Sequence, residues 1–477
     1  MIAPDTAPSS QPAQATVMPE PSNYVWGIAM VAALGGLLFG YDWVVIGGAR
    51  QFYEQYFHLT SAALVGWANG CALIGCLFGS LAAGPLASHY GRRRILLLAA
   101  VLFALSSGLT GWAKTIDAFI LWRIVGGTAI GLSSNVSPLF IAEVSPAAIR
   151  GRLVGLNQFA IVIGILLAQI VNWLIARPVL QGVTSAQAFQ SWNVQFGWRW
   201  MFTAVIVPSL IFTVASLFLP ESPRWLLVKG REREARTILE RIGGIRFAVA
   251  EIAAIEQALK FEGTNRSSIR ELLRPGIRRM LLIGVGLAVL QQWTGINVLF
   301  NYAGDVYRSA GFGTNEILLD IVITGTINLL FTILAMALVD RIGRRPLMIF
   351  GCFGIGVSHL LCALAYYSGW PPVAVLALTL SAIACYAMTL APLTWVLIAE
   401  IFPNRIRSQG VSAAVSALWI ASFLLTYTFP SMNRILGIGG TFLTYGAFCV
   451  LGGVLSISFV PETRGRSLEE IEMHQQG

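Results

Sequence analysis

Two residues of opposite charge, Asp42 and Arg123, lie deep within apolar stretches of this sequence. Asp42 is in the segment GGLLFGYDWVVIGG, and Arg123 is in ILWRIVGGTAIG. A carboxylate at the centre of a helix that crosses a bilayer costs about 2.5–3.5 kcal/mol on insertion scales. The two residues can form a structural ion pair that locks two helices together. They can also form a switchable pair, in which movement of Arg123 makes Asp42 bind or release a proton.

Uncharged polar side chains are concentrated in the segment LQQWTGINVLFNYAG. Gly295 weakens the helix there, so a local break can aim several amides into one cavity. Such amides either bond to neighbouring helices or bind a ligand. Amides offer donors and acceptors without net charge, and together with flat tryptophan faces they suit a neutral sugar better than a carboxylate or a phosphate. The amides and tryptophans concerned are Gln158, Gln291, Gln292, Asn297, Asn301, Asn328, Trp395 and Trp419.

The elements that must position these side chains are membrane-spanning helices. The chain has 477 residues, of which 56% are hydrophobic and 12% charged, with a mean hydropathy of +0.70. A soluble protein carries about 25% charged residues. Apolar stretches of the length that a bilayer requires predict an all-α membrane protein of twelve helices. We place them near 25–47, 62–87, 95–113, 116–141, 153–176, 199–219, 279–304, 317–339, 346–368, 372–399, 409–430 and 437–460.

Basic residues are distributed unevenly between the two sides of these helices. Most arginines of the short loops fall on one side, together with the long connection 220–278 and the C-terminal tail. By the positive-inside rule, that side and both termini are cytoplasmic. The net charge of +9 therefore reflects topology and does not indicate a nucleic-acid partner. Residues 1–22 are rich in Pro, Ala, Ser and Gln and predict a disordered cytoplasmic tail, not a signal peptide.

Several kinds of chemistry have no counterpart in the sequence. The six cysteines fall within predicted helices, as small core residues do, and the four histidines lack metal-ligand spacing. We find neither a Walker A phosphate loop nor a catalytic triad. The sequence therefore predicts a protein that is not an enzyme and that uses no cofactor and no metal.

The sequence repeats itself once. FIAEVSPAAIRG, from Phe140, matches LIAEIFPNRIRS, from Leu397, and YGRRRILL matches IGRRPLMI. PESPR at Pro220 has a weaker echo in PETRG at Pro461. We therefore predict two six-helix halves, 23–219 and 279–460, joined by a cytoplasmic linker, 220–278, with short amphipathic helices and followed by a cytoplasmic tail, 461–477. Two similar bundles around a central site are typical of alternating access.

These motifs resemble those of the sugar porter family of the major facilitator superfamily, which includes proton–xylose symporters and facilitative glucose transporters. The resemblance runs from about Val25 to Glu472. It rests on GYD at 40–42, GRRR at 91–94, IAE-x-x-P-x-x-IRG at 141–151, PESPRWL at 220–226, QQWTGIN at 291–297, DRIGRRP at 340–346 and PETRG at 461–465.

The resemblance implies roles at the matching positions. Sugar hydroxyls would be held by Gln158, Gln291, Gln292, Asn297 and Asn328, in a pocket lined by Phe39, Trp395 and Trp419. Asp42 stands where proton-coupled members carry an acid and facilitative members an asparagine. A cytoplasmic charge network would close the outward-facing state. Its residues would be Arg92, Arg93, Glu143, Arg150, Asp340, Arg344, Arg345, Glu400 and Arg407.

Departures from the family pattern leave the sugar open. Asn301 replaces a usual tyrosine, and Leu418 replaces an amide before Trp419. We expect a monomeric, multi-pass transporter of the inner membrane that imports a neutral monosaccharide, a hexose or pentose such as glucose or xylose, together with a proton. A facilitative uniporter and a membrane sugar sensor that does not transport are the alternatives.

Overall fold

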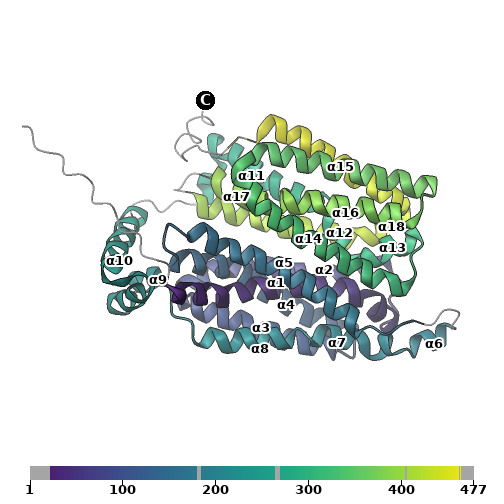
Figure 1. Ribbon diagram of the computed structural model, residues 1–477, viewed down its shortest axis with the longest axis horizontal. Helices are drawn as coiled ribbons and strands as arrows, with labels where there is room; N and C mark the ends of the chain where they lie inside the picture. Colours follow the sequence, from purple (N-terminus) through teal and green to yellow (C-terminus); the bar gives the residue numbers. More distant parts are fainter. Residues whose placement is uncertain (1–21, 180–183, 264–268, 403–405, 461, 463–477) are drawn as a thin grey trace, which may run out of the picture.

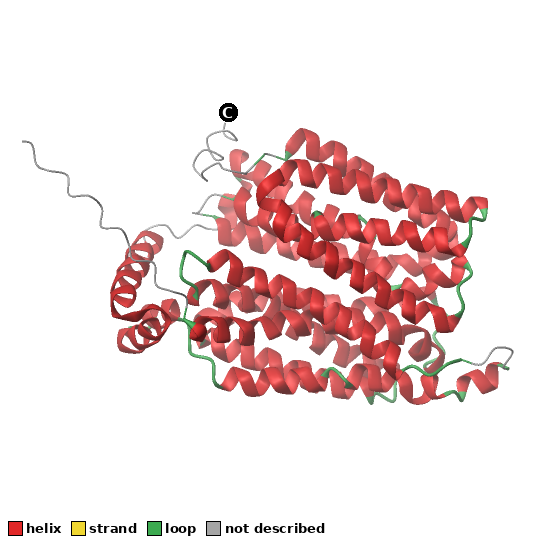
Figure 2. Cartoon of the chain, viewed as in Figure 1, coloured by secondary structure: helices red, strands yellow, loops and turns green. Residues whose placement is uncertain are grey.

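Long helices account for nearly all of the regular structure. The computed structural model describes residues 22–179, 184–263, 269–402, 406–460 and 462. Within these residues every regular element is a helix (Figure 2), as the hydropathy pattern predicts. Most of the helices run side by side along the long axis of the molecule (Figure 1).

The helices of residues 23–219 form one layer, coloured purple to blue in Figure 1. The first helix continues to Tyr56, well beyond the predicted end near residue 47. The hydropathy pattern ends early because the last two turns of this helix contain charged residues. The sixth span contains a π-helical turn at its start. The helices are α1 (Asn23–Tyr56), α2 (Ala62–Tyr90), α3 (Arg92–Gly111), α4 (Ile116–Val144), α5 (Arg150–Ile175), α6 (Ser185–Phe189), η1 (Asn193–Gly197), α7 (Trp198–Thr203) and α8 (Ile206–Leu217).

The helices after residue 274 form the second layer, coloured green to yellow (Figure 1). They are α11 (Pro275–Trp293), α12 (Ile296–Asn301), α13 (Ala303–Ala310), α14 (Thr314–Ile342), α15 (Arg344–Ser368), α16 (Pro372–Met388), α17 (Leu390–Ile401) and α18 (Arg407–Phe459). The described part of the chain contains 11 helical segments long and apolar enough to span a membrane. The last is 51 residues long and is broken at Gly437, whose φ is 69°. It therefore holds two of the twelve predicted spans.

The linker contributes three helices: α9 (Pro223–Val228), α10 (Glu232–Gly263) and η2 (Ile269–Leu273). Gly244 has a left-handed φ of 82° and divides α10 into two parts. Helices α9 and α10 lie at one end of the bundle, and α6 lies at the opposite end (Figure 1). We call these the linker end and the far end.

The two layers are in close contact through glycine-lined crossings. On α2, Gly66 faces the backbone of Tyr427 and Gly70 faces the ring of Phe423, both on α18. On α14, Gly325 faces the side chain of Gln169 on α5. A side chain at Gly66 or Gly325 would collide with these neighbours, so small residues permit the close approach.

Candidate functional site

Asp42 and Arg123 form a buried ion pair between α1 and α4. The Arg123 Nη1 atom lies 2.9 Å from Asp42 Oδ1, and the residues are only 2% and 3% exposed. The guanidinium also donates to the Asp42 carbonyl at 3.4–3.5 Å and lies over the ring of Phe202. Asp42 Oδ2 is buried and has no hydrogen-bond partner in the described part of the chain. One carboxylate oxygen is thus held by Arg123, and the other is not hydrogen-bonded within the described residues.

The amides of the QQWTGIN segment meet at a helix break. Helix α11 ends at Trp293 and α12 begins at Ile296, because Gly295 takes a left-handed φ of 78°. Gln292 Nε2 donates to Gln291 Oε1 at 2.8 Å, and Asn297 Nδ2 donates to Gln292 Oε1. The two glutamines are buried, and Asn297 is half-buried. The break therefore arranges three amides in one hydrogen-bonded row, which we call the amide row.

Three aromatic rings cluster where α1 meets α18. The ring centroids of Phe39 and Trp419 are 6.1 Å apart, and Trp43 lies 6.0 Å from Phe39 and 5.9 Å from Trp419. Trp419 Nε1 is buried without a hydrogen-bond partner in the described residues. Trp395, on α17, is half-buried against the same core. Trp43 was not singled out from the sequence, although an indole next to a buried acid in an apolar helix was a usable signal.

A small cavity connects the ion pair to the amide-bearing helices. Its lining residues include Trp43, Asn69, Arg123 and Asn301. Asn301 is the last residue of α12, and its Oδ1 atom is buried without a partner in the described chain. Arg123 and Asn301 are therefore neighbours across one cavity, although they come from different layers.

Two of the residues expected to contact the sugar lie on helices other than those that carry the amide row. Gln158 is half-buried on α5, and Asn328 is buried on α14. Helices α5 and α14 pack against each other across the two layers. Within the described residues no hydrogen bond joins Gln158 or Asn328 to the amide row.

At the linker end, the expected gating charges pair within each layer. Arg92 binds Glu143 through two hydrogen bonds of 2.8 and 2.9 Å, and Arg344 lies 3.9 Å from Glu400. The remaining arginines bond to carbonyl oxygens of their own layer: Arg93 to Leu217, Arg150 to Ser145, Arg345 to Ile457 and Arg407 to Phe402. The side chain of Asp340 lies outside the described residues.

The glutamates of the two PE motifs cap helices, a role that the sequence motifs did not predict. Glu221 Oε1 accepts from the backbone N–H groups of Arg92 and Arg93 at 2.8 and 3.2 Å. Glu462 accepts from those of Arg344 and Arg345 at 3.1 and 3.2 Å. A carboxylate at a helix N-terminus satisfies unpaired N–H groups and interacts favourably with the helix dipole. The repetition of PE after GRR in both halves was the available signal.

At the far end, charged and polar contacts join the two layers. Arg50 on α1 forms an ion pair with Asp305 on α13, and Arg308 donates to Gln51. Arg434 donates to the Thr60 carbonyl at 3.1 Å. These residues were not singled out from the sequence. The contacts hold the far ends of the layers together, in contrast to the pairs within each layer at the linker end.

Comparison with known proteins places nearly the whole chain in one family. The profile of the family described as "Sugar (and other) transporter" matches residues 28–474. The D-xylose-proton symporter of Escherichia coli (strain K12) is 38% identical over 482 residues, which cover 94% of this chain and 96% of the relative. The glucose transport protein of Synechocystis is 38% identical, over 97% of this chain and 100% of the relative. The arabinose-proton symporter of Bacillus subtilis is 35% identical, over 94% of this chain and 95% of the relative.

Solved structures agree with these relatives. The inward open conformation of the xylose transporter XylE from E. coli superposes with a TM-score of 0.83 at 36% identity, over 94% of this chain and 100% of that one. The twelve-helix arrangement described above is thus the major facilitator fold.

Proposed function

This chain belongs to the sugar transporter family, and we propose that it imports a neutral monosaccharide by symport with a proton. The observation that carries this proposal is the buried Asp42–Arg123 pair, which a facilitator without coupling has no need to place in its core. The similarity over nearly the full length to relatives named as xylose-proton and arabinose-proton symporters supports it. The protein is a transporter of the bacterial inner-membrane type and not an enzyme.

In the proposed mechanism Asp42 carries the proton and Arg123 sets its occupancy. Arg123 holds one oxygen of the carboxylate, so protonation of Asp42 weakens the ion pair and frees α4 to move relative to α1. As Arg123 closes on Asp42 again, the proton is released. Arg123 stays charged throughout because a guanidinium does not lose its proton in this pH range.

The proposed sugar site lies between the layers and includes the amide row. Gln291, Gln292 and Asn297 already satisfy one another in part, so a sugar hydroxyl entering the row exchanges one set of hydrogen bonds for another. Phe39, Trp395 and Trp419 supply flat apolar faces for the sugar ring. The proposed set of sugar-binding amides also includes Gln158, Asn301 and Asn328.

We propose that the linker end is cytoplasmic and that the far end faces outwards, as the arginine distribution predicts. Both termini are then cytoplasmic, and the halves are 23–219 and 279–460, with the lipid bilayer around both. The far-end contacts Arg50–Asp305 and Arg308–Gln51 support an inward-facing form. The superposition on the inward open relative supports the same form. The charges at the linker end would act as the latch of the outward-facing form, and a monomer contains the complete site.

Transport assays in proteoliposomes test the function. Radiolabelled xylose, glucose, arabinose, galactose and fructose are offered with and without an acidic exterior. The expected result is accumulation of at least one of these sugars above its external concentration only when the pH gradient is imposed. Uptake that only equilibrates under every gradient would identify a uniporter, and binding without uptake would identify a sensor.

A further inference from the structure

We propose that Glu54 is a proton-relay residue, which takes a proton at the far end and passes it through Asn69 and the cavity beside it to Asp42. This rests on the proposed proton coupling at Asp42. The relay places a titratable carboxylate at the outer end of the same helix that carries Asp42. Twelve residues of α-helix separate them, about 18 Å along the axis, so transfer between them needs intermediate groups.

Glu54 is an acid within the membrane-spanning length of α1 that the coupling mechanism has not used. Its side chain is 20% exposed, and Arg50 Nε lies 3.2 Å from its Oε1 atom. The amide of Asn69 on α2 interacts with its carboxylate. The charged and titratable groups around it are Arg50 and Tyr53 on α1, Tyr302 just before α13, and Asp305 and Arg308 on α13. The carboxylate thus faces the protein interior at one side and the far-end surface at the other.

The cavity described above continues the path from Asn69 to the ion pair. Asn69 and Arg123 both line it, as do Trp43 and Asn301. Asn69 Oδ1, Asn301 Oδ1 and Arg123 Nε are buried and lack hydrogen-bond partners in the described residues. Buried polar atoms without protein partners are usually bonded to water, and the cavity offers about 10 Å³ to a water molecule, which is about the room of one. Opening of the far end would widen the same space.

The proton balance of the relay is simple. A hydronium ion outside transfers its proton to the Glu54 carboxylate. Protonated Glu54 then gives a proton to the water held at Asn69, and that water gives a proton to Asp42. Glu54 returns to the carboxylate, Asp42 becomes the neutral acid, and no other group changes its net charge.

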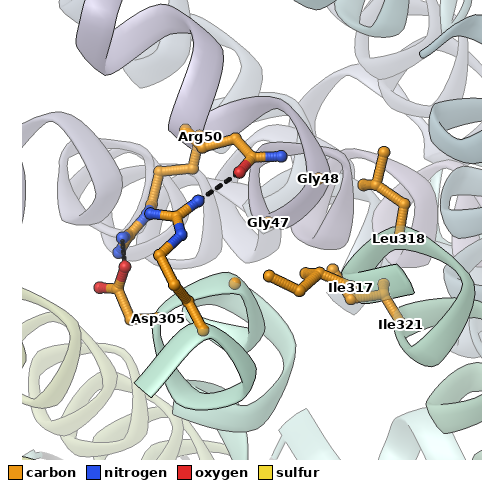
Figure 3. Close-up of a pocket in the computed structure, with 10 residues that line it drawn as sticks. Gly47, Gly48, Arg50, Asp305, Ile317, Leu318 and Ile321 are labelled. Carbon is orange, nitrogen blue, oxygen red and sulfur yellow. Dashed lines mark hydrogen bonds and ion pairs between the residues drawn. The ribbon is translucent and has the colours of Figure 1, made fainter. Parts of the chain in front are cut away.

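The far-end ion pair lies beside Glu54. Figure 3 shows Arg50 reaching from α1 to Asp305 on α13 beside Gly47 and Gly48. In this conformation the Arg50 guanidinium is paired with both acids, Glu54 on its own helix and Asp305 on α13. Separation of the layers at the far end would break Arg50–Asp305 and leave Arg50 paired with Glu54 alone.

A simpler role for Glu54 is to balance the charge of Arg50. Three substitutions separate the roles. Glu54→Gln keeps the shape and the contact with Asn69 but cannot carry a proton. Asn69→Leu removes a relay amide and changes no charge. Asp305→Asn removes the other acid paired with Arg50 and leaves the relay intact. Glu316→Gln, at an exposed far-end carboxylate, is the matched control.

The experiment measures initial rates of sugar uptake into proteoliposomes against external pH, together with exchange of preloaded sugar at equal pH and sugar affinity by calorimetry. We expect Glu54→Gln and Asn69→Leu each to lower proton-driven uptake about tenfold or more, since a positioned acid–base group is worth roughly 10²–10⁴-fold in rate. Exchange and affinity in these two variants should stay within about twofold. Asp305→Asn, which removes a contact between the layers, should change the rate of uptake but not its pH dependence.

Three results would overturn the relay. In the first, Glu54→Gln takes up sugar like Glu316→Gln at every pH. In the second, Glu54→Gln and Asp305→Asn share one defect while Asn69→Leu behaves normally, which assigns Glu54 to charge balance. In the third, the unmodified protein never accumulates sugar, and the proposed symport fails together with the relay.

Discussion

The amide row predicts that its members bind sugar as a unit. Gln292 is the central member, because it donates to Gln291 and its Oε1 atom accepts from Asn297. Gln292→Ala removes the sugar contact of this amide and leaves both neighbours without a partner. An unsatisfied buried polar group costs about 1–3 kcal/mol, which corresponds to roughly 5- to 150-fold in affinity. We expect a loss in this range for Gln292→Ala and also for Asn297→Ala.

The double variant tests whether the row acts as a unit. If the two losses were independent, they would multiply. Because the side chains are in direct contact, we expect a coupling free energy of about 0.5–3 kcal/mol, so the double variant should bind only slightly more weakly than Gln292→Ala. Both residues lie beside the left-handed Gly295, so the row exists only because the helix is broken there.

The assay is calorimetric titration of the purified protein with the sugar that gives the highest uptake. Thr326→Ala is the control, since this hydroxyl is exposed on α14 and bonds to its own helix. Unchanged affinity in both single variants would exclude the amide row from the sugar site. A double variant whose loss equals the product of the single losses would refute the cooperative row while leaving the site in place.

Three further predictions concern coupling, gating and the helix break. Asp42→Asn should still exchange sugar but should not accumulate it. With one proton per sugar, the unmodified protein should reach up to about tenfold accumulation for each pH unit of the imposed gradient. Accumulation and exchange are compared in the same proteoliposomes. Glu400→Gln should favour the inward-facing form and slow turnover, and equal spin-label distances across the linker end in variant and parent would contradict this. Gly295→Ala should lower the thermal unfolding temperature. A Cβ at this position would lie 2.5 Å from the Tyr445 ring, and a left-handed backbone costs alanine about 1–2 kcal/mol. Thermal unfolding of the purified protein in detergent measures this temperature.

The sequence predicts the helices well because burial in lipid leaves few alternatives. Twelve spans and the break near Gly295 follow from hydropathy and glycine placement, and the structure confirms them. The end of α1 was predicted too early. Hydropathy falls after Gly48 because Arg50 and Glu54 are charged, yet the helix continues since Asp305 and Asn69 satisfy these charges from other elements.

Contacts between layers were beyond the reach of sequence patterns. Arg50 and Asp305 stand near helix ends, where charged residues are ordinary, and only the three-dimensional packing brings α1 and α13 together. The helix caps made by Glu221 and Glu462 could not be predicted from the sequence either. The repeat of PE after GRR was visible, but the backbone N–H groups that these carboxylates accept from leave no mark on the sequence.

The placement of the ion pairs explains how a few charges can bias a large movement. At the far end Arg50–Asp305 joins the layers, whereas at the linker end Arg92–Glu143 and Arg344–Glu400 stay within their own layers. A contact between layers stabilises one conformation, while a contact within a layer leaves the equilibrium unchanged until its members find partners across the gap. In the proposed cycle, the arginines of the linker end exchange partners as Arg50 releases Asp305. Moving a two-state population from 1:99 to 99:1 takes about 5.5 kcal/mol, and we expect a small number of such exchanges, together with one proton on Asp42, to supply it.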